Sequence, residues 1–411
     1  MKNLIIVLLF MCSSMTLSAQ IDGKVVVGLI DSIESKILEE KRTVWVHVPE
    51  EYDLDNPSDK KYPVMYLLDG GGHFYSVAGM MRQLSSINGN TICPKMIVVA
   101  ILNTNRTRDL TPTKPTKAHP FADSSMIANS GGGKQFLAFV EKELIPHING
   151  KYPTEDYKMF IGHSFGGLTV MNTLVENPEL FNSYVAIDPS MWWDGGKLLN
   201  EIKNTVLDSR YENRSLYVSI ANTLPEGMDV AHAKNDKSPM TEHFRLAMEL
   251  KDYLENNESS QLKFKGKYYP EDTHGSVPLI SEYDALRFIF DFYQLKMGAE
   301  DYMNPESDVV SKVVNHYEKL SMEFGKKMLP EEDFVNNMGY QFMSMKQFKK
   351  SEGFFKLNVA NYPESFNVYD SLGDLYVEMG EKEKAIEQFK MSISINSESY
   401  SKEKLKKLID E

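Results

Sequence analysis

The apolar positions in the first three-quarters of the chain predict strands that alternate with helices. Residues 43–49 alternate apolar and polar side chains, as a half-buried strand does. Short apolar runs typical of buried strands occupy 62–68, 96–102, 157–161, 183–188, 215–221 and 262–269. Helical spacing of apolar residues occurs over 134–145, 241–256 and 281–295. We therefore expect an α/β domain over residues 20–296, with a mostly parallel central sheet covered by helices on both faces.

Past residue 297 the strand patterns stop and only helical patterns remain. A shift of residues 332–365 by 34 positions superposes Gly339 on Gly373 and Phe355 on Phe389. This period resembles the tetratricopeptide repeat, in which small residues let two helices pack closely. It predicts a linker with one helix over 297–330, then a small all-α domain over 331–411: two repeats, 333–365 and 366–399, and a capping helix, 402–410. A protein partner and a purely structural role both stay open for it.

The first 19 residues have the pattern of a secretory signal peptide. Lys2 precedes the apolar run 4–10, which is too short to span a bilayer, and Leu17-Ser18-Ala19 places small residues before Gln20. Lipid attachment at Cys12 is disfavoured because Met11 stands where that processing needs a small residue. No later stretch reaches the roughly 20 apolar residues of a membrane helix. We expect a cleaved, periplasmic or secreted protein that is not an integral membrane protein.

Charge and cysteine content exclude several function classes. The chain of 411 residues has 58 Asp plus Glu against 45 Lys plus Arg, a formal charge of −13, so nucleic acid is not an expected partner. Signal cleavage would leave Cys93 alone, which excludes an internal disulfide and zinc sites built from several thiolates. The sequence has no H-E-x-x-H, P-loop or G-x-G-x-x-G motif. We therefore expect no metal and no cofactor.

A nucleophile motif follows one of the predicted strands. Gly162-His163-Ser164-Phe165-Gly166 comes directly after the strand 157–161 and opens a helical pattern. A strand, G-x-S-x-G and a helix in this order form the tight turn of a nucleophile elbow, which leaves a serine hydroxyl above the sheet. Serine needs an adjacent base to act at neutral pH. The motif makes Ser164 the candidate nucleophile.

His274 is the best candidate for that base. It follows the last predicted strand, 262–269, on a loop, and α/β sheets collect their ligands at the carboxyl ends of strands. His47 lies within a strand, and His163 lies inside the elbow with its side chain expected to point away. Four other histidines stay open as alternatives: His73, His119, His232 and His243.

Four motifs together resemble the putative esterase family of α/β-hydrolases, which includes esterase D, enterochelin-type siderophore esterases, feruloyl esterases and mycolyltransferases. They are Leu67-Leu68-Asp69-Gly70-Gly71, the Ser164 elbow, Asp188-Pro189-Ser190-Met191-Trp192-Trp193 and His274-Gly275-Ser276. The resemblance covers residues 25–295. It implies a Ser–acid–His hydrolase with an oxyanion hole from the backbone N–H groups of Gly71 and Phe165. The run Gly70–Gly72 agrees, since glycines let a backbone approach a substrate oxygen closely.

The acid of this triad is less well defined by the sequence. In such enzymes the order along the chain is nucleophile, acid, histidine. The acid is therefore expected after the strand 215–221 and before His274. Glu226 is the first choice, and the alternatives are Asp229, Asp236, Asp272 or a Ser–His dyad without an acid.

Two further positions are candidates for substrate contact. The loop Asn105–Pro112 is similar to one that borders the active site in this family, so Arg106 or Arg108 could face an anionic or catechol-bearing substrate. A structural ion pair of one arginine with Asp109 is the alternative. Trp192 could line the pocket or belong to the core.

These observations predict a serine carboxylic-ester hydrolase that works through an acyl-enzyme and acts on a small-molecule ester. The family resemblance makes siderophore or feruloyl-type esters the candidate substrates. An acyltransferase or a peptidase with the same triad would use the same oxyanion chemistry. A non-catalytic assembly protein that acts through its repeats is the remaining alternative.

Overall fold

The computed structural model describes residues 23–52, 60–117 and 119–410. The predicted signal peptide lies outside these residues. One sheet of eight strands forms the centre of the first domain, in the order β1-β2-β4-β3-β5-β6-β7-β8. Its strands are β1 Leu29–Ser35, β2 Glu40–His47, β3 Tyr62–Leu67, β4 Ile97–Ile101, β5 Thr154–His163, β6 Ser183–Ile187, β7 Ser215–Ala221 and β8 Lys263–Tyr269. The pairs β1·β2 and β2·β4 are antiparallel and all others are parallel, which confirms the predicted fold class.

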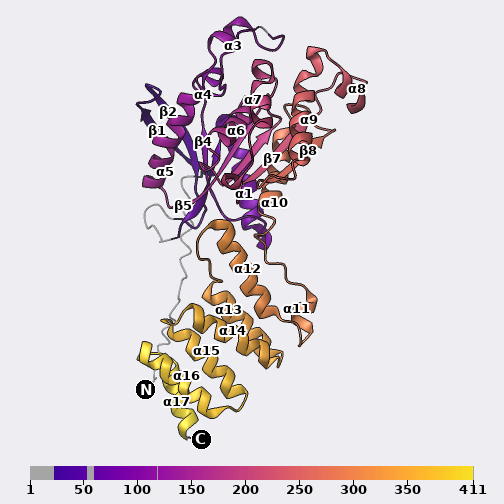
Figure 1. The fold of residues 1–411 in the computed structure, drawn as a ribbon. Helices are drawn as coiled ribbons and strands as arrows, with labels where there is room; N and C mark the ends of the chain where they lie inside the picture. Colours follow the sequence, from indigo (N-terminus) through magenta and orange to yellow (C-terminus); the bar gives the residue numbers. More distant parts are fainter. Residues whose placement is uncertain (1–22, 53–59, 118, 411) are drawn as a thin grey trace, which may run out of the picture.

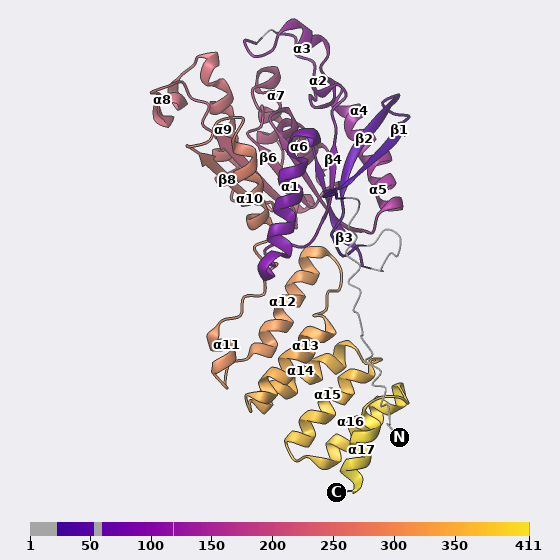
Figure 2. The same cartoon turned by 180° about the vertical axis from the view of Figure 1, so that it is seen from behind.

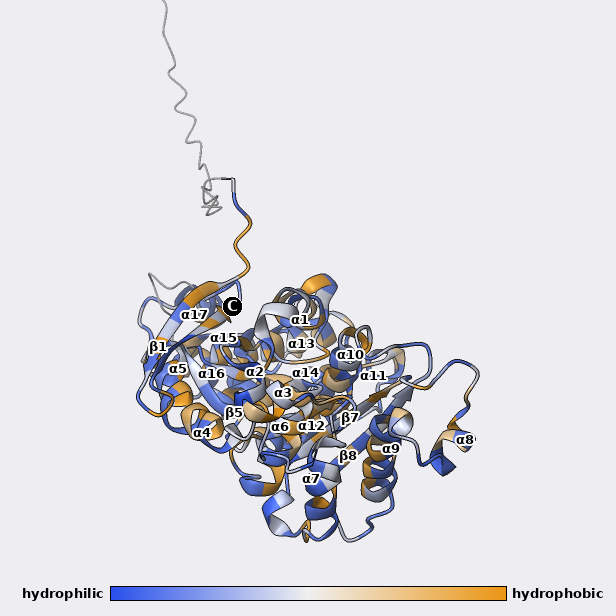
Figure 3. Ribbon diagram, turned by 90° about the horizontal axis from the view of Figure 1, so that it is seen from above, coloured by the Kyte–Doolittle hydropathy of each residue, from blue (hydrophilic) through white to orange (hydrophobic). Residues whose placement is uncertain are grey.

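Helices cover both faces of this sheet, and each face has its own apolar core. One face carries α1 Gly70–Ser85 and α10 Val277–Ile289, which lie in front of the sheet in Figure 2. The other carries α4 Gly133–Phe139, α5 Ile145–Lys151, α6 Phe165–Glu176, α7 Trp193–Lys203 and α9 Glu242–Glu255. Short helices α2 Arg106–Asp109, α3 Ser124–Ala128 and α8 Val230–Asn235 belong to the loops. Hydrophobic and hydrophilic residues alternate around the outer helices in Figure 3, as expected for helices with one face on a core.

The Gly70–Gly72 run forms the first turn of α1. Two local features differ from the sequence prediction. The edge strand β1 was not predicted, and its burial pattern is irregular because it pairs on one side only. The helix predicted to end at 145 continues past Pro146 to Lys151 through a π-helical turn, Val140–Leu144. Such a turn shifts the backbone hydrogen bonds, so that a proline without an N–H can be accommodated.

The C-terminal region is all-helical, as predicted. Its helices are α11 Ala299–Met303, α12 Val309–Phe324, α13 Glu332–Ser344, α14 Phe348–Asn361, α15 Phe366–Glu378, α16 Lys382–Ile395 and α17 Ser401–Asp410. The helices α13 to α16 form two hairpins. A side chain at Gly339 would collide with the ring of Phe355, and one at Gly373 with Phe389. The close approach of the two helices in each hairpin therefore depends on these glycines. None of the described helices is long and apolar enough to cross a membrane.

Helix α12 joins this region to the sheet domain. Leu320 and Phe324 belong to the core on the α1/α10 face, where the Phe324 ring lies 5.1 Å from that of Tyr157, near the start of β5. Val309 and Val313 belong to the core of the first hairpin. The hairpins lie below the sheet in Figure 1, at the amino ends of the parallel strands. Tyr157 and Ser164 are seven positions apart along β5 and its end, which is about 23 Å in an extended strand.

Candidate active site

The carboxyl ends of five parallel strands bring the candidate residues to one edge of the sheet. Asp69 follows β3, Ser164 follows β5, Asp188 follows β6, Thr223 follows β7 and His274 follows β8. Ligands of open α/β sheets bind at this edge because the loops there converge.

Ser164 lies in a strained turn between β5 and α6. Its backbone angles are φ 60° and ψ −114°, which few residues other than glycine adopt. A side chain at Gly162 would collide with the backbone of Gly166, so the turn requires glycine there. The Ser164 N–H donates to the Ile187 carbonyl at 2.9 Å, which ties the turn to β6. The predicted elbow is therefore present, with its serine at the apex.

His274 is held by a carboxylate that is not among the acids predicted from the sequence. Its Nδ1 lies 2.6 Å from Oδ2 of Asp188, a residue with no exposed surface. His243 Nε2 lies 3.0 Å from the same oxygen, and the Ala221 N–H donates to Oδ1 at 3.0 Å. Burial alone would raise the pKa of Asp188, but the charge and hydrogen bond of His243, together with those of His274, outweigh it and hold the pKa well below its usual range. Asp188 is thus an ionised carboxylate with three donors.

The carboxylates predicted from chain order lie elsewhere. Glu226 is exposed, and among the described residues no hydrogen bond or ion pair joins it to His274. Asp229 caps α8 and pairs with His232, Asp236 accepts from Ser238 and Thr241, and Asp272 accepts from Ser276. The structure therefore places Asp188, and not Glu226, against the imidazole.

Asp188 preserves the chain order that was expected, since it lies between Ser164 and His274. The prediction placed the acid after β7, but β6 is the strand that pairs directly with the nucleophile strand β5. The signal available in the sequence was a carboxylate at the end of the buried run 183–188. A carboxylate at the end of a buried strand needs partners, because an unpaired buried charge is costly.

Ser164 and His274 line one cavity of about 400 Å³, together with Ser190 and His243. The Ser164 Oγ lies 3.2 Å from the Ser190 Oγ. Within the described residues no hydrogen bond joins Ser164 to His274. Catalytic hydrogen bonds are often long without substrate.

The two backbone groups predicted for the oxyanion hole lie at helix amino termini. Gly71 is in the first turn of α1, and Phe165 is the first residue of α6. The N–H groups of a first helical turn have no partner within the helix and carry partial positive charge. The two turns are in contact, because a side chain at Gly166 would lie 3.4 Å from the Asp69 carboxylate. Gly71 and Phe165 therefore both lie at helix amino termini, and their role as oxyanion donors stays a prediction.

Both arginines of the 105–112 loop form ion pairs within the protein. Arg106 binds Asp69 through two hydrogen bonds of 2.7 and 2.8 Å and also donates to the His163 carbonyl. Arg108 pairs with Asp109 and with Glu40, so an arginine–Asp109 pair is present. Arg106 thus joins Asp69, the residue before α1, to the Ser164 elbow, which gives it a structural role in addition to any substrate contact.

Trp192 lines the cavity, with Phe121 and Met240 at its rim. Phe121 is 40% exposed and Met240 is 59% exposed, so both offer apolar surface to a ligand. The Trp192 ring stacks on His119 at 4.4 Å between centroids, and Glu242 holds that imidazole at 3.0 Å. The indole is therefore fixed in place as an apolar wall of the cavity. Phe121 lies in a turn and Met240 in the short 3-10 helix Pro239–Thr241, and no motif or periodicity marks either residue in the sequence.

A second buried imidazole lies beside His274. The ring of His163 is 4.4 Å from that of His274, measured between centroids. Burial, followed by the charge of His274, lowers the pKa of His163 to about 4. The prediction that this side chain points away from the site is therefore wrong. His163 is neutral at pH 7 and adds no charge beside His274.

Among the described residues, one group has ligand atoms close enough together to suit a metal ion, and its members are Asp188, His243 and His274. Two ligands 2.0–2.1 Å from a tetrahedral zinc would lie about 3.3 Å apart. The observed separations from Asp188 Oδ2 are 2.6 and 3.0 Å. These are hydrogen-bond lengths, so the arrangement fits a proton-sharing cluster better than a metal centre.

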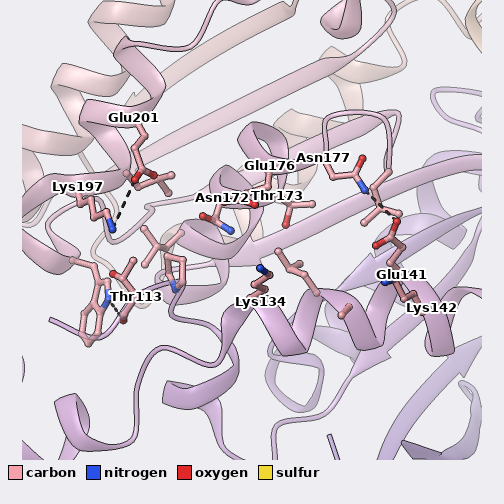
Figure 4. Close-up of a pocket in the computed structure, with 17 residues that line it drawn as sticks. Thr113, Lys134, Glu141, Lys142, Asn172, Thr173, Glu176, Asn177, Lys197 and Glu201 are labelled. Carbon is pink, nitrogen blue, oxygen red and sulfur yellow. Dashed lines mark hydrogen bonds and ion pairs between the residues drawn. The ribbon is translucent and has the colours of Figure 1, made fainter. Parts of the chain in front are cut away.

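A separate pocket of about 350 Å³ lies between α4, α6 and α7 (Figure 4). The Trp193 ring lies 5.0 Å from that of Phe165 and forms part of the pocket wall, so it stands between this pocket and the elbow. The rim has three lysines and three glutamates, Lys134, Lys142, Lys197, Glu141, Glu176 and Glu201. Because these charges cancel, the lining selects neither anions nor cations.

Comparison with known proteins points to the same region of the chain. The family model described as putative esterase matches residues 35–275. Ferri-bacillibactin esterase BesA of Bacillus subtilis is 30% identical over 178 residues, which cover 40% of this chain and 60% of that protein. Siderophore triacetylfusarinine C esterase of Aspergillus fumigatus is 30% identical over 171 residues, which cover 38% of this chain and 55% of that protein. The chain thus spans little more than half the length of these relatives.

Solved structures extend the similarity over more of the chain. An IroE-like serine hydrolase from Shewanella oneidensis is 31% identical and matches 80% of this chain and 98% of its own, with a TM-score of 0.65. An uncharacterised protein from Capnocytophaga ochracea covers 93% of this chain and 99% of its own at 19% identity and a TM-score of 0.64. The second match extends into the helical region and concerns the fold alone.

Proposed function

Because the chain belongs to the putative esterase family, we propose that it is a serine carboxylic-ester hydrolase with Ser164 as nucleophile, His274 as base and Asp188 as orienting acid. The observation that carries the proposal is the 2.6 Å contact of His274 Nδ1 with a fully buried carboxylate, in the cavity that Ser164 lines. Asp188 replaces Glu226 as the acid of this triad. Gly71 and Phe165 are the proposed oxyanion donors.

The proposed reaction follows from this geometry. Asp188 accepts the Nδ1 hydrogen of His274, which leaves Nε2 with a lone pair as the base. Nε2 removes the Ser164 proton as Oγ attacks the ester carbonyl, and the two N–H groups bind the oxyanion. His274 then protonates the leaving alcohol, and an acyl-enzyme is formed. Water, deprotonated by the same imidazole, releases the acid and restores Ser164.

Esters of siderophore type are the proposed substrates. One relative is named as a ferri-bacillibactin esterase and another as a siderophore triacetylfusarinine C esterase. The family model covers residues 35–275, which include Ser164, Asp188 and His274. The cavity adds an apolar wall of Trp192, Phe121 and Met240, which suits a bulky acyl or alcohol group. Feruloyl esters fit the same wall. Transfer of the acyl group to an acceptor other than water uses the same residues and is the second candidate function.

Location and partners are also proposals. The signal peptide over residues 1–19 and the motifs of the repeats favour a periplasmic or secreted enzyme with tetratricopeptide-like hairpins. A protein partner of the hairpins would bind at the amino ends of the strands, away from the cavity (Figure 1).

The test is fluorophosphonate labelling and ester hydrolysis by the wild type and by Ser164→Ala. We expect both to be lost in the variant, because triad members act as a unit worth about 10⁶-fold in rate in a well-studied serine hydrolase. Ser190→Ala, which removes the neighbouring hydroxyl, is the matched control and should still be labelled. Hydrolysis by Ser164→Ala at the wild-type rate would refute the proposal.

A further inference from the structure

We infer that His243 is a positioning residue, which fixes the plane of the Asp188 carboxylate so that Oδ2 faces His274. This inference rests on the proposed hydrolase function. It starts from the unusual sharing of one carboxylate oxygen by two imidazoles, His274 at 2.6 Å and His243 at 3.0 Å.

His243 donates to Asp188 and does not accept from it. The carboxylate is ionised, so Nε2 of His243 carries the hydrogen in this contact. The other ring nitrogen, Nδ1, is buried and has no hydrogen-bond partner among the described atoms. Among the described contacts, His243 therefore acts on Asp188 through Nε2.

Each oxygen of the Asp188 carboxylate accepts a hydrogen bond from a residue in a regular element of the fold. The Ala221 N–H binds Oδ1 from the end of β7, and His243 binds Oδ2 from the first turn of α9. With both oxygens held, the carboxylate cannot rotate about its Cβ–Cγ bond. His274 sits on a loop, and its side chain is 41% exposed, so its orientation depends on this fixed acceptor.

The charged and titratable groups around His243 have other partners. Glu242, the residue before it, binds His119, and Arg245 donates to Thr241 and to the Ser238 carbonyl. Asp188 and His274 are the groups that face the His243 ring, at 3.0 Å to the carboxylate and 5.3 Å between ring centroids. The effect of His243 is therefore expected to pass through Asp188.

The test is His243→Leu in the full chain, with kcat, KM and the pH profile of kcat/KM on a small p-nitrophenyl ester. We expect kcat to fall about 10- to 100-fold, the range for one hydrogen bond to a charged group, and KM to stay unchanged. The apparent pKa of kcat/KM should rise, because a carboxylate with one donor fewer stabilises the His274 imidazolium more strongly. A purely structural role would not move this pKa.

Rescue and control variants separate the role of the hydrogen bond from that of the fold. His243→Gln places an amide N–H where Nε2 lies and should restore kcat and the pKa, while the shorter His243→Asn should not. The matched control is His232→Leu, since His232 is an exposed residue of α8 that contacts Asp229 and not Asp188. It should behave as the wild type. If His243→Leu does not fold, the kcat of His243→Gln compared with that of His243→Asn tests the inference.

The possible failures can be distinguished. If Ser164→Ala is inactive but His243→Leu keeps the kcat and the apparent pKa of the wild type, the role of His243 alone is overturned. Equal activity of His243→Asn and His243→Gln would overturn it as well. An active Ser164→Ala would instead overturn the proposed hydrolase.

Discussion

Replacement of Asp188 by asparagine tests the choice of the acid most directly. The Ala221 N–H donates to Oδ1, so the amide oxygen of the new side chain would stay there and its NH₂ group would take the place of Oδ2. That group would face Nδ1 of His274 at 2.6 Å and Nε2 of His243 at 3.0 Å. Because it donates hydrogens, His274 would have to accept at Nδ1 and carry its own hydrogen on Nε2. In that tautomer the imidazole cannot take the proton of Ser164.

The magnitude follows from this change of tautomer. The equivalent change in a well-studied serine protease lowers kcat about 10⁴-fold, and at about 1.36 kcal/mol for each factor of ten this is about 5 kcal/mol in the barrier. We expect a loss of this size for Asp188→Asn on p-nitrophenyl acetate. Glu226→Gln, the matched control, should change kcat less than about twofold, because this carboxylate is exposed and has no hydrogen bond to His274 among the described residues.

Initial rates at pH 7.5, with circular dichroism to show that each variant is folded, are the measurement. A loss below tenfold in a folded Asp188→Asn would refute the assignment of this acid. A large loss in Glu226→Gln would restore the acid that chain order alone had favoured.

Three further predictions concern pH and truncation. The kcat/KM of the wild type should fall at acid pH, because a protonated imidazole cannot act as the base, and a flat profile from pH 5 to 8 would contradict this. Burial lowers the pKa of His163 to about 4, so this residue binds a proton more readily in the unfolded chain. The free energy of unfolding should therefore be unaffected by His163 above pH 6.5 and should fall between pH 6.5 and 4, by up to about 3 kcal/mol. Urea unfolding of His163→Gln should show a shallower fall over this range, and an equal fall would refute the argument. A chain that ends at Pro330 keeps α12 and should keep its kcat/KM on small esters. A chain that ends at Asn304 loses Leu320 and Phe324 from the core of the sheet domain. It should unfold at a lower temperature, since the loss of each large apolar side chain from a core costs about 2–5 kcal/mol.

Burial and local turn chemistry explain which parts of the molecule the sequence could predict. The runs 62–68 and 215–221 are mostly apolar because both faces of the sheet are covered, and they match the fully buried strands β3 and β7 closely. The Ser164 elbow is a local motif, so its glycines are visible in the sequence. The edge strand β1 escaped prediction because a strand paired on one side only has a weak apolar pattern.

Long-range pairing explains the part of the site that the sequence did not reveal. Asp188 and His274 are 86 residues apart, and Asp188 and His243 are 55 residues apart. Each pair depends on which strand lies beside which, and chain order does not determine this. Glu226 had the expected place along the chain, but the loop that contains it leaves its side chain in solvent.

Helix α12 fixes the direction in which the cavity faces. Residues near its start are part of the core of the first hairpin, and residues near its end are part of the core on the α1/α10 face of the sheet. A helix of 16 residues is a rod of about 24 Å, stiffer than a flexible linker. A partner bound to the hairpins would therefore hold the sheet domain in a fixed orientation, with the mouth of the Ser164 cavity facing away from that partner. Bulky esters could then reach Ser164 without passing the anchoring surface.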